Sequence, residues 1–333
     1  MDRPPQARLT GHITATERTG GTVMAIIVMT GSSSGFGEIA ARLAREKGAD
    51  VLAGARTVST NFIPVDLACL DSVRAFAATV RQRLGDTPLD ALVLNAGLIL
   101  PNDAERTHDG FETTFAVNHL AHYLLVRLLM PSFAEEARIV ITTSGTHDPT
   151  LRTGLEAPRH ADADLLAHPD RDTERHLVPQ RAGQHAYSAS KLCNVLTVRA
   201  LSVHPDIRAR HITALAYDPG QVFGTGLVRS LPRPRRIASS VFGTALGAPL
   251  RRLDRTMNTR AAAGLALASL VSGRTTPPPG RCYAALRSGR LSFPDPSTLA
   301  RRDDVARALW NDSARMVGLT VDESLGTPGL PSR

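Results

Sequence analysis

A tyrosine and a lysine four residues apart carry the clearest chemistry in the sequence. Tyr187 and Lys191 stand in the run Tyr-Ser-Ala-Ser-Lys, and a helix would place both side chains on one face. A free phenol has a pKa of about 10, and a neighbouring ammonium stabilises the phenolate and lowers that pKa toward the working pH. The pair therefore predicts a group that exchanges a proton with a substrate oxygen. An ordinary surface pair on a helix is the alternative.

A serine at the end of a predicted strand adds to this chemistry. Ser144 follows the run 138–143, which is typical of a buried strand. A carbonyl that receives a hydride develops negative charge on its oxygen, and it needs hydrogen-bond donors and a proton there. Ser144 can hold the substrate oxygen near the Tyr187 hydroxyl. The three side chains predict hydride transfer to or from a carbonyl or alkene carbon.

A glycine-rich turn indicates where the hydride comes from. Residues 30–37 read Thr-Gly-Ser-Ser-Ser-Gly-Phe-Gly, between the β-branched run 25–30 and a run with helical spacing at 36–47. Glycines at this place let the backbone approach a pyrophosphate, and the helix N-terminus favours its negative charge. A simple tight turn is the alternative. The context predicts a dinucleotide site formed by Gly31, Ser33, Ser34, Gly35, Phe36 and Gly37.

The end of the second predicted strand bears on the choice of cofactor. An acidic residue there would bind a ribose 2′-hydroxyl and select NAD. Ala55 occupies that place and Arg56 follows it, and a guanidinium suits a 2′-phosphate in charge and geometry. NADP(H) is therefore the preferred cofactor. NAD(H) stays as the alternative, because Arg56 in this Arg-rich chain can equally face solvent.

Strands alternate with helices along the chain, which predicts an α/β fold with a parallel sheet covered on both faces. We expect a single domain with a doubly wound, Rossmann-type sheet. Only residues 57–61 separate Arg56 from Phe62, too few for a crossover helix, so we expect a bare loop there. The expected strands are 25–30, 50–55, 62–65, 89–94, 138–143, 211–217 and 281–286, and the expected helices are 36–47, 71–83, 110–130, 186–203 and 258–271.

The domain is expected over residues 23–320, after a disordered leader at 1–22 and before a flexible tail at 321–333. Residues 145–185 and 229–255 interrupt the alternation and are predicted to be surface insertions near the site. The second joins Arg clusters to an apolar stretch. It is interpreted first as a lid over an apolar substrate, second as a peripheral membrane contact, and third as a helix pair packed on the core.

Composition narrows the partners. The formal net charge of +8 is spread along the chain and aromatic residues make up 4%, so we expect no nucleic-acid partner. The three cysteines have no paired or metal-like spacing, which predicts no metal site, no disulfide and a reducing cytoplasm. The histidines of 145–185 have irregular spacing and indicate a solvated loop. No apolar run approaches the length of about 20 residues that spans a bilayer.

Taken together, the motifs resemble the short-chain dehydrogenase/reductase family. The glycine pattern, Asn95-Ala96-Gly97, Asn118, Ser144, the Tyr187–Lys191 run and Pro219-Gly220 with Thr225 follow the family's order over about residues 23–320. The resemblance implies a catalytic tetrad of Asn118, Ser144, Tyr187 and Lys191, with Asn118 supporting a water linked to Lys191. It also implies cofactor contacts from Asp66 and Leu67 to the adenine, from Asn95, Ala96 and Gly97 to the ribose, and from Pro219, Gly220, Val222 and Thr225 near the nicotinamide.

Two segments resemble one branch of that family more closely. Residues 117–125 and 190–194 are similar to retinol-dehydrogenase-like and light-dependent protochlorophyllide-reductase-like members. Cys193 falls where the photoenzyme has a cysteine, but Gln221 replaces a second one, which favours a reductase or dehydrogenase that works in the dark. The resemblance implies a small, apolar carbonyl, alcohol or conjugated alkene as substrate. The photoenzyme, a non-catalytic NADP(H)-binding sensor or scaffold, and a homo-oligomer stay open as alternatives.

Overall fold

The computed structural model describes residues 24–57, 59–223, 254 and 256–321. The expected leader at 1–22, the segment 229–255 apart from Asp254, Thr225, and the tail beyond residue 321 lie outside the described residues. Their expected roles stay predictions.

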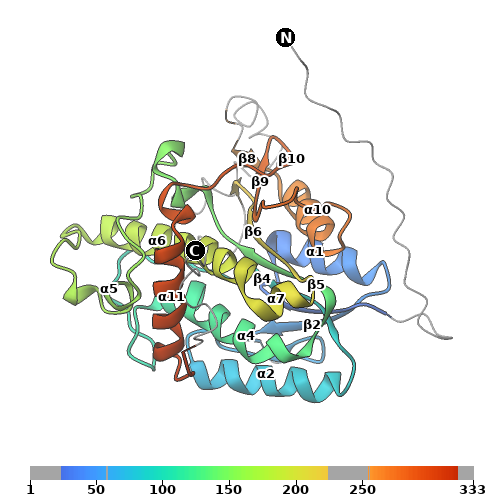
Figure 1. The fold of residues 1–333 in the computed structure, drawn as a ribbon. Helices are drawn as coiled ribbons and strands as arrows, with labels where there is room; N and C mark the ends of the chain where they lie inside the picture. Colours follow the sequence, from blue (N-terminus) through green and yellow to red (C-terminus); the bar gives the residue numbers. More distant parts are fainter. Residues whose placement is uncertain (1–23, 58, 224–253, 255, 322–333) are drawn as a thin grey trace, which may run out of the picture.

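A mostly parallel sheet with helices on both faces forms the centre of the molecule, as the alternation of elements predicts (Figure 1). Within the described residues the sheet has eight strands in the order β10-β9-β6-β5-β4-β1-β2-β3. Only β10 runs antiparallel, against β9. The strands are β1 Ile26–Thr30, β2 Asp50–Ala55, β3 Ile63–Pro64, β4 Leu89–Leu94, β5 Phe133–Thr142, β6 Thr213–Asp218, β9 Tyr283–Arg287 and β10 Arg290–Ser292, with a separate parallel pair of β7 Gln221–Val222 and β8 Met257–Asn258.

Two apolar cores lie on the two faces of the sheet because successive side chains of a strand point to opposite sides. On β1, Ile27 and Met29 join the core under α1 and α10, whereas Val28 joins the larger core under α2, α4, α6 and α11 (Figure 1). Both faces are thus buried, which explains the nearly continuous apolar runs of these strands. The helices are α1 Gly35–Arg45, α2 Leu70–Leu84, α3 Thr113–Phe115, α4 Ala121–Leu129, α5 Ala163–Ala167, α6 Pro179–Val203, α7 Pro205–Ala209, α10 Arg260–Val271 and α11 Asp303–Met316.

The link between β2 and β3 is a loop, as the short spacing predicts. β3 pairs with β2 only at its end, Gly54 with Ile63 and Ala55 with Pro64. The described residues of the link contain no helix, and Phe62 N–H donates to Ser59 O across a turn. Because β3 is two residues long, the chain has little distance to return and needs no crossover helix.

The two helices that carry site residues differ from their expected form. Expected at 186–203, α6 begins at Pro179, in a position where proline starts a helix well, so the insertion ends earlier than residue 185. The helix expected at 110–130 contains a π turn, Ala116–Leu120, in which Ala121 N–H donates to Ala116 O. Such widened turns are frequent at functional sites, and this one carries Asn118.

The histidines of the insertion are not the solvated residues that their spacing indicates. His147 and His185 are buried, at 1% and 7% exposure, and none of His160, His168 and His176 is fully exposed. The described part of the chain holds no group of histidine, cysteine and acidic side chains arranged for a metal ion. Among the described helices, none is long and apolar enough to cross a membrane.

Candidate active site

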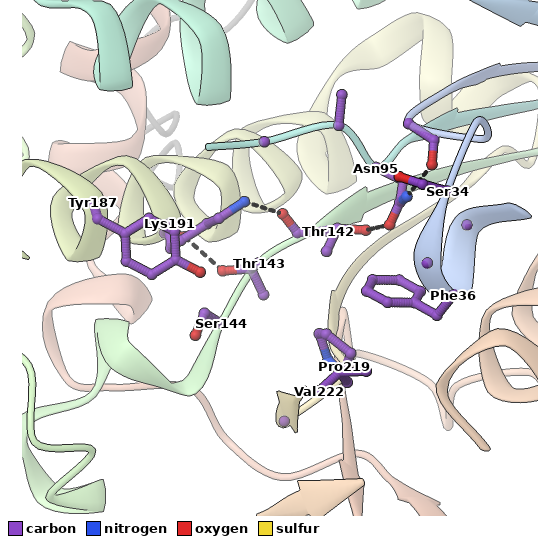
Figure 2. Close-up of a pocket in the computed structure, with 16 residues that line it drawn as sticks. Ser34, Phe36, Asn95, Thr142, Thr143, Ser144, Tyr187, Lys191, Pro219 and Val222 are labelled. Carbon is purple, nitrogen blue, oxygen red and sulfur yellow. Dashed lines mark hydrogen bonds between the residues drawn. The ribbon is translucent and has the colours of Figure 1, made fainter. Parts of the chain in front are cut away.

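A cleft opens at the carboxyl ends of the strands and holds about 730 Å³ of empty space, including the solvent at its mouth. It lies between β1 and β4, from which the chain continues in opposite directions across the sheet, to β2 and to β5. Ligands of open parallel sheets bind at such a switch point. The cleft brings together most of the residues singled out in the sequence (Figure 2). These are Gly31, Ser34, Gly35, Phe36, Gly37, Asn95, Ala96, Gly97, Ser144, Tyr187, Lys191, Pro219, Gly220 and Val222, joined by Thr142 and Thr143.

The glycine-rich loop fits closely against the end of β4. Gly31 has a φ of +68°, and a Cβ there would lie 2.5 Å from Ala96 N, so a side chain cannot be accommodated. Asn95 Nδ2 donates to Gly31 O at 2.9 Å, and Thr142 Oγ1 donates to Asn95 Oδ1 at 2.9 Å (Figure 2). The ends of β1, β4 and β5 are therefore joined at the cleft. Thr142 could not be singled out from the sequence, because its contacts with Asn95 and Lys191 are formed only in the folded chain.

The loop leads directly into α1, whose N-terminus faces the cleft. The first-turn N–H groups of a helix have no partner within it, and the Ser34 side chain does not cap them. Free N–H groups and close backbone approach are what a pyrophosphate needs. The loop and helix therefore fit a dinucleotide.

The expected adenine side is more open. Arg56 and Asp66 are exposed, as is Ser33, and none of the three lines the cleft. The Leu67 side chain packs in the core, so any contact with an adenine would come from its backbone. The roles assigned to these residues stay predictions.

The tyrosine and lysine lie on one face of α6, as their spacing predicts. Lys191 Nζ is 5.8 Å from the centroid of the Tyr187 ring and donates to Thr142 O at 3.1 Å (Figure 2). The Ser144 side chain is close enough to the Tyr187 phenol to lower its pKa. The proton-transfer group and the oxygen-binding group are therefore adjacent at one end of the cleft.

The pKa of Tyr187 differs from the expected direction. The spacing alone predicts that Lys191 lowers it, but burial raises the pKa of Tyr187 to about 12, with a smaller contribution from the Asp218 charge, against the lowering effect of the Ser144 hydrogen bond. Burial also lowers the pKa of Lys191 to about 8. The expectation was wrong because burial disfavours the phenolate more than any other influence, while the Lys191 ammonium donates to a backbone carbonyl instead. At neutral pH Tyr187 is a phenol that holds its proton.

Asn118 lies behind the cleft and does not line it. Its buried side chain donates to Leu98 O and Ser190 Oγ, and accepts from Leu98 N. A Cβ on Gly97 would lie 3.1 Å from Asn118 Oδ1 and 3.3 Å from Lys191 Nζ. The absence of a side chain at Gly97 thus lets Asn118 and Lys191 approach one another.

A buried ion pair supports the loops on the other side of the cleft. Asp218, with no exposed surface, accepts from Gly220 N at 2.9 Å, Tyr283 Oη at 2.9 Å and Arg287 Nη2 at 2.6 Å. A Cβ on Gly145 would lie 3.1 Å from Asp218 Oδ2. The carboxylate therefore lies between the turn at Pro219-Gly220 and the segment that follows Ser144. The sequence offered no signal for this pair, whose members are 69 residues apart.

Comparisons with known proteins bear on this geometry. Residues 25–151 match the family model described as short chain dehydrogenase. Across 95% of this chain and 82% of the relative, the sequence is 30% identical to a protochlorophyllide reductase of Daucus carota. The chain belongs to the short-chain dehydrogenase/reductase family.

Further similar proteins support the assignment of this chain to the short-chain dehydrogenase/reductase family. Protochlorophyllide reductase A of Oryza sativa subsp. japonica is 31% identical, over 88% of this chain and 81% of that protein. Among solved structures, a 3-alpha-hydroxysteroid dehydrogenase from Pseudomonas sp. B-0831 complexed with NADH has a TM-score of 0.53 and 25% identity, covering 74% of this chain and 89% of that one. These relatives confirm the family and the protochlorophyllide-reductase-like branch that the motifs indicate. The chain is therefore an NAD(P)-dependent oxidoreductase that acts on a small molecule.

Proposed function

We propose that this short-chain dehydrogenase/reductase uses NADPH to reduce a carbonyl group, or a conjugated alkene, of an apolar small molecule, with Tyr187 as the proton donor. The observation that carries the proposal is the cluster of Ser144, Tyr187 and Lys191 at the end of a cleft lined by the glycine-rich loop. When bound, the nicotinamide supplies the hydride.

The chain's own residues supply what the substrate oxygen needs. As negative charge develops there, the Ser144 hydroxyl orients the oxygen and Tyr187 releases its proton to it. Lys191, positively charged below a pH of about 8, stabilises the phenolate that remains. We therefore expect kcat for reduction to fall above about pH 8, as Lys191 loses its proton.

The preference for NADPH rests on the end of β2. Ala55 leaves no carboxylate to accept a ribose 2′-hydroxyl, and the exposed Arg56 offers a guanidinium for a 2′-phosphate. The bare loop after Arg56 leaves this edge open, so Arg56 would carry most of the selection.

A titration with NADPH and NADH, followed by a panel of aldehydes, ketones and quinones, tests the proposal. Arg56→Ala should weaken NADPH binding about tenfold to a hundredfold, the value of a hydrogen bond to a charged group, and leave NADH binding unchanged. Arg42→Ala, which removes an exposed Arg of α1, is the matched control. Tyr187→Phe should lower turnover about a hundredfold or more and retain NADPH binding.

A light-dependent protochlorophyllide reductase is the second candidate, favoured by relatives that match over most of their length. Cys193 argues against it, because its side chain is fully buried and burial raises the pKa of its thiol. Gln221, which replaces the second cysteine of the photoenzyme, donates to Thr256 Oγ1 at 2.8 Å and to Asp254 Oδ2 at 3.3 Å. Turnover of protochlorophyllide in the light but not in the dark would establish this candidate.

Tight NADPH binding with no turnover of any substrate would support a sensor. Binding of neither cofactor would overturn the proposal.

A further inference from the structure

A buried histidine connects the glycine-rich loop to Asn118. His122 lies on α4, four residues after Asn118, and is 1% exposed. Its Nε2 is 3.1 Å from Thr30 Oγ1, and its Nδ1 is 3.2 Å from the main-chain oxygen of Asn118. Both ring nitrogens thus meet residues that flank the active site.

The partners of Thr30 determine which nitrogen carries the proton. Thr30 Oγ1 accepts from Asn95 N at 3.1 Å and from Ala96 N at 3.2 Å. A hydroxyl has two acceptor positions and one proton, so Thr30 donates that proton to His122 Nε2. Nδ1 is then the protonated nitrogen, and it donates to Asn118 O.

The surroundings keep this ring neutral. Burial, aided by the Lys191 and His119 charges and opposed by the hydrogen bond to Asn118, lowers the pKa of His122 to about 3. A cationic ring would stand in the field of the Lys191 ammonium with no acidic partner among these groups. The neutral tautomer with a proton on Nδ1 is therefore the form that the site holds.

The two hydrogen bonds join structures that contribute different halves of the site. Thr30 directly precedes Gly31, the first glycine of the cofactor loop, and the Asn118 side chain contacts Leu98 and Ser190. Lys191 follows Ser190 and approaches Asn118 beside Gly97. A displacement of the His122 ring would move Asn118 relative to both the loop and the lysine.

We propose that His122 is a positioning residue, which fixes the carbonyl of Asn118 and the end of β1 relative to each other so that the cofactor loop and Lys191 keep one geometry. The proposal rests on the proposed function for its effect on turnover. The structural part of the proposal, a neutral His122 hydrogen-bonded to Thr30 and Asn118, does not depend on which substrate the enzyme uses.

His119 provides a matched control on the same helical stretch. It is equally buried, and burial lowers its pKa to about 3 as well. However, its Nε2 is 2.8 Å from Ser313 Oγ on α11, away from Thr30. Replacing either histidine should cost a similar amount of stability, whereas only His122 should affect the geometry of the site.

Four variants separate positioning from packing: His122→Phe, His122→Asn, Thr30→Val and His119→Asn. Misplacement of catalytic groups by about 1 Å can cost about a hundredfold in rate, so we expect His122→Phe to lower kcat by up to that factor. The KM of the carbonyl substrate should change little, and the alkaline limit set by Lys191 should move. His122→Asn, which keeps a donor near Asn118 O, should recover part of kcat. His119→Asn should lower the melting temperature and leave kcat and the pH profile unchanged.

The Thr30 variant tests the connection itself. Thr30→Val removes this link and also the acceptor of Asn95 N and Ala96 N, so it should lower kcat at least as much as His122→Phe does. The double variant should be no slower than Thr30→Val alone, because both changes remove the same link. Additive losses, or a His122→Phe enzyme whose kcat and pH profile match those of His119→Asn, would overturn the proposal.

Two measurements keep the result separate from the proposed function. If the wild type binds NADPH but reduces nothing, His122→Phe and Thr30→Val should still weaken NADPH binding, and His119→Asn should not. Nitrogen NMR of the histidine rings, assigned with the His122→Asn variant, should show His122 neutral and protonated on Nδ1 from pH 5 to 8. A His122 protonated on Nε2, or one that titrates in this range, refutes the inference whatever the enzyme's activity.

Discussion

At the scale of single residues, the charge of Asp218 links the two sides of the cleft. Three donors satisfy its carboxylate, of which only Arg287 is a cation. Arg287 is itself three-quarters buried. Removing one partner of such a pair leaves a charge in a poorly solvated place, whereas removing both does not. The pair therefore stabilises the site through mutual neutralisation.

Arg287→Met should lower the free energy of unfolding by about 3–5 kcal/mol, the cost of an uncompensated buried charge. Adding Asp218→Asn should restore most of the loss, because an amide keeps an acceptor for Gly220 N without the charge. Urea unfolding at pH 7 measures both. Arg42→Met, which breaks the exposed pair with Glu46, should cost less than about 1 kcal/mol. Equal costs for the two Met variants would contradict the prediction.

At the scale of elements, the helical stretch that carries Asn118 begins at a buried carboxylate. Glu112 has no exposed surface, and its two oxygens accept from Thr114 N at 2.9 Å and Phe115 N at 2.6 Å. These bonds satisfy the free N–H groups of the first turn. Burial nevertheless raises the pKa of Glu112 to about 7, aided by the Asp103 charge and opposed by the two hydrogen bonds.

The contribution of Glu112 to the stability of the protein should fall as pH rises from 5 to 8. The pKa of Glu112 is about 7 in the folded chain against 4.5 for the free side chain, so the folded state binds the proton more tightly. This stabilisation is fully present below pH 4.5 and is lost as pH rises through 7, an effect of about 3 kcal/mol at most.

Urea midpoints of the wild type and Glu112→Gln across this range measure the contribution. The glutamine variant should lose about 1 kcal/mol at pH 5 through its weaker cap, and its stability relative to the wild type should rise between pH 5 and pH 8 as the wild type loses the Glu112 contribution. Glu46→Gln, at an exposed position of α1, should run parallel to the wild type. A Glu112→Gln curve parallel to the wild type would instead show that Glu112 does not titrate in this range.

At the scale of the whole molecule, the C-terminal helix covers the helices that carry the active site. Trp310 of α11 is 1% exposed, and its ring centroid lies 4.9 Å from that of Tyr123 on α4, with the two rings nearly perpendicular. The Arg127 guanidinium lies 5.4 Å from the centroid of the Trp310 ring. In Figure 1, α11 runs across α6. The helix therefore covers part of the face of α4 and α6 that a second chain would need for contact with these helices.

Trp310→Ala should cost about 3–5 kcal/mol of stability, because it removes the largest buried side chain between α11 and α4. We expect the wild type to have the mass of one chain in light scattering, and the variant to associate as α11 loosens. Ala308→Ser, on the exposed side of the same helix, should change stability by less than about 0.5 kcal/mol. A wild-type dimer that Trp310→Ala leaves intact would show that the covered face is not what limits association.

The positions of the motifs within the fold could be predicted because their signals are local. An apolar run before a glycine cluster marks a strand that ends at a cofactor loop, and a spacing of four places Tyr187 and Lys191 on one helix face. The missing crossover helix followed from counting residues. Helix ends were predicted less well, since α6 extends to Pro179 and Asn118 lies in a π turn, where the competing local geometries differ little in energy.

The sequence by itself therefore determined the fold class and the family, and it predicted most of the residues that line the cleft. Only the tertiary structure decided how these residues are tuned. Thr30 and His122 are 92 positions apart, and Asp218 and Arg287 are 69 apart, so no spacing rule connects them. The pKa of Tyr187 rises instead of falling because burial, which depends on every element packed around α6, is the largest influence on it.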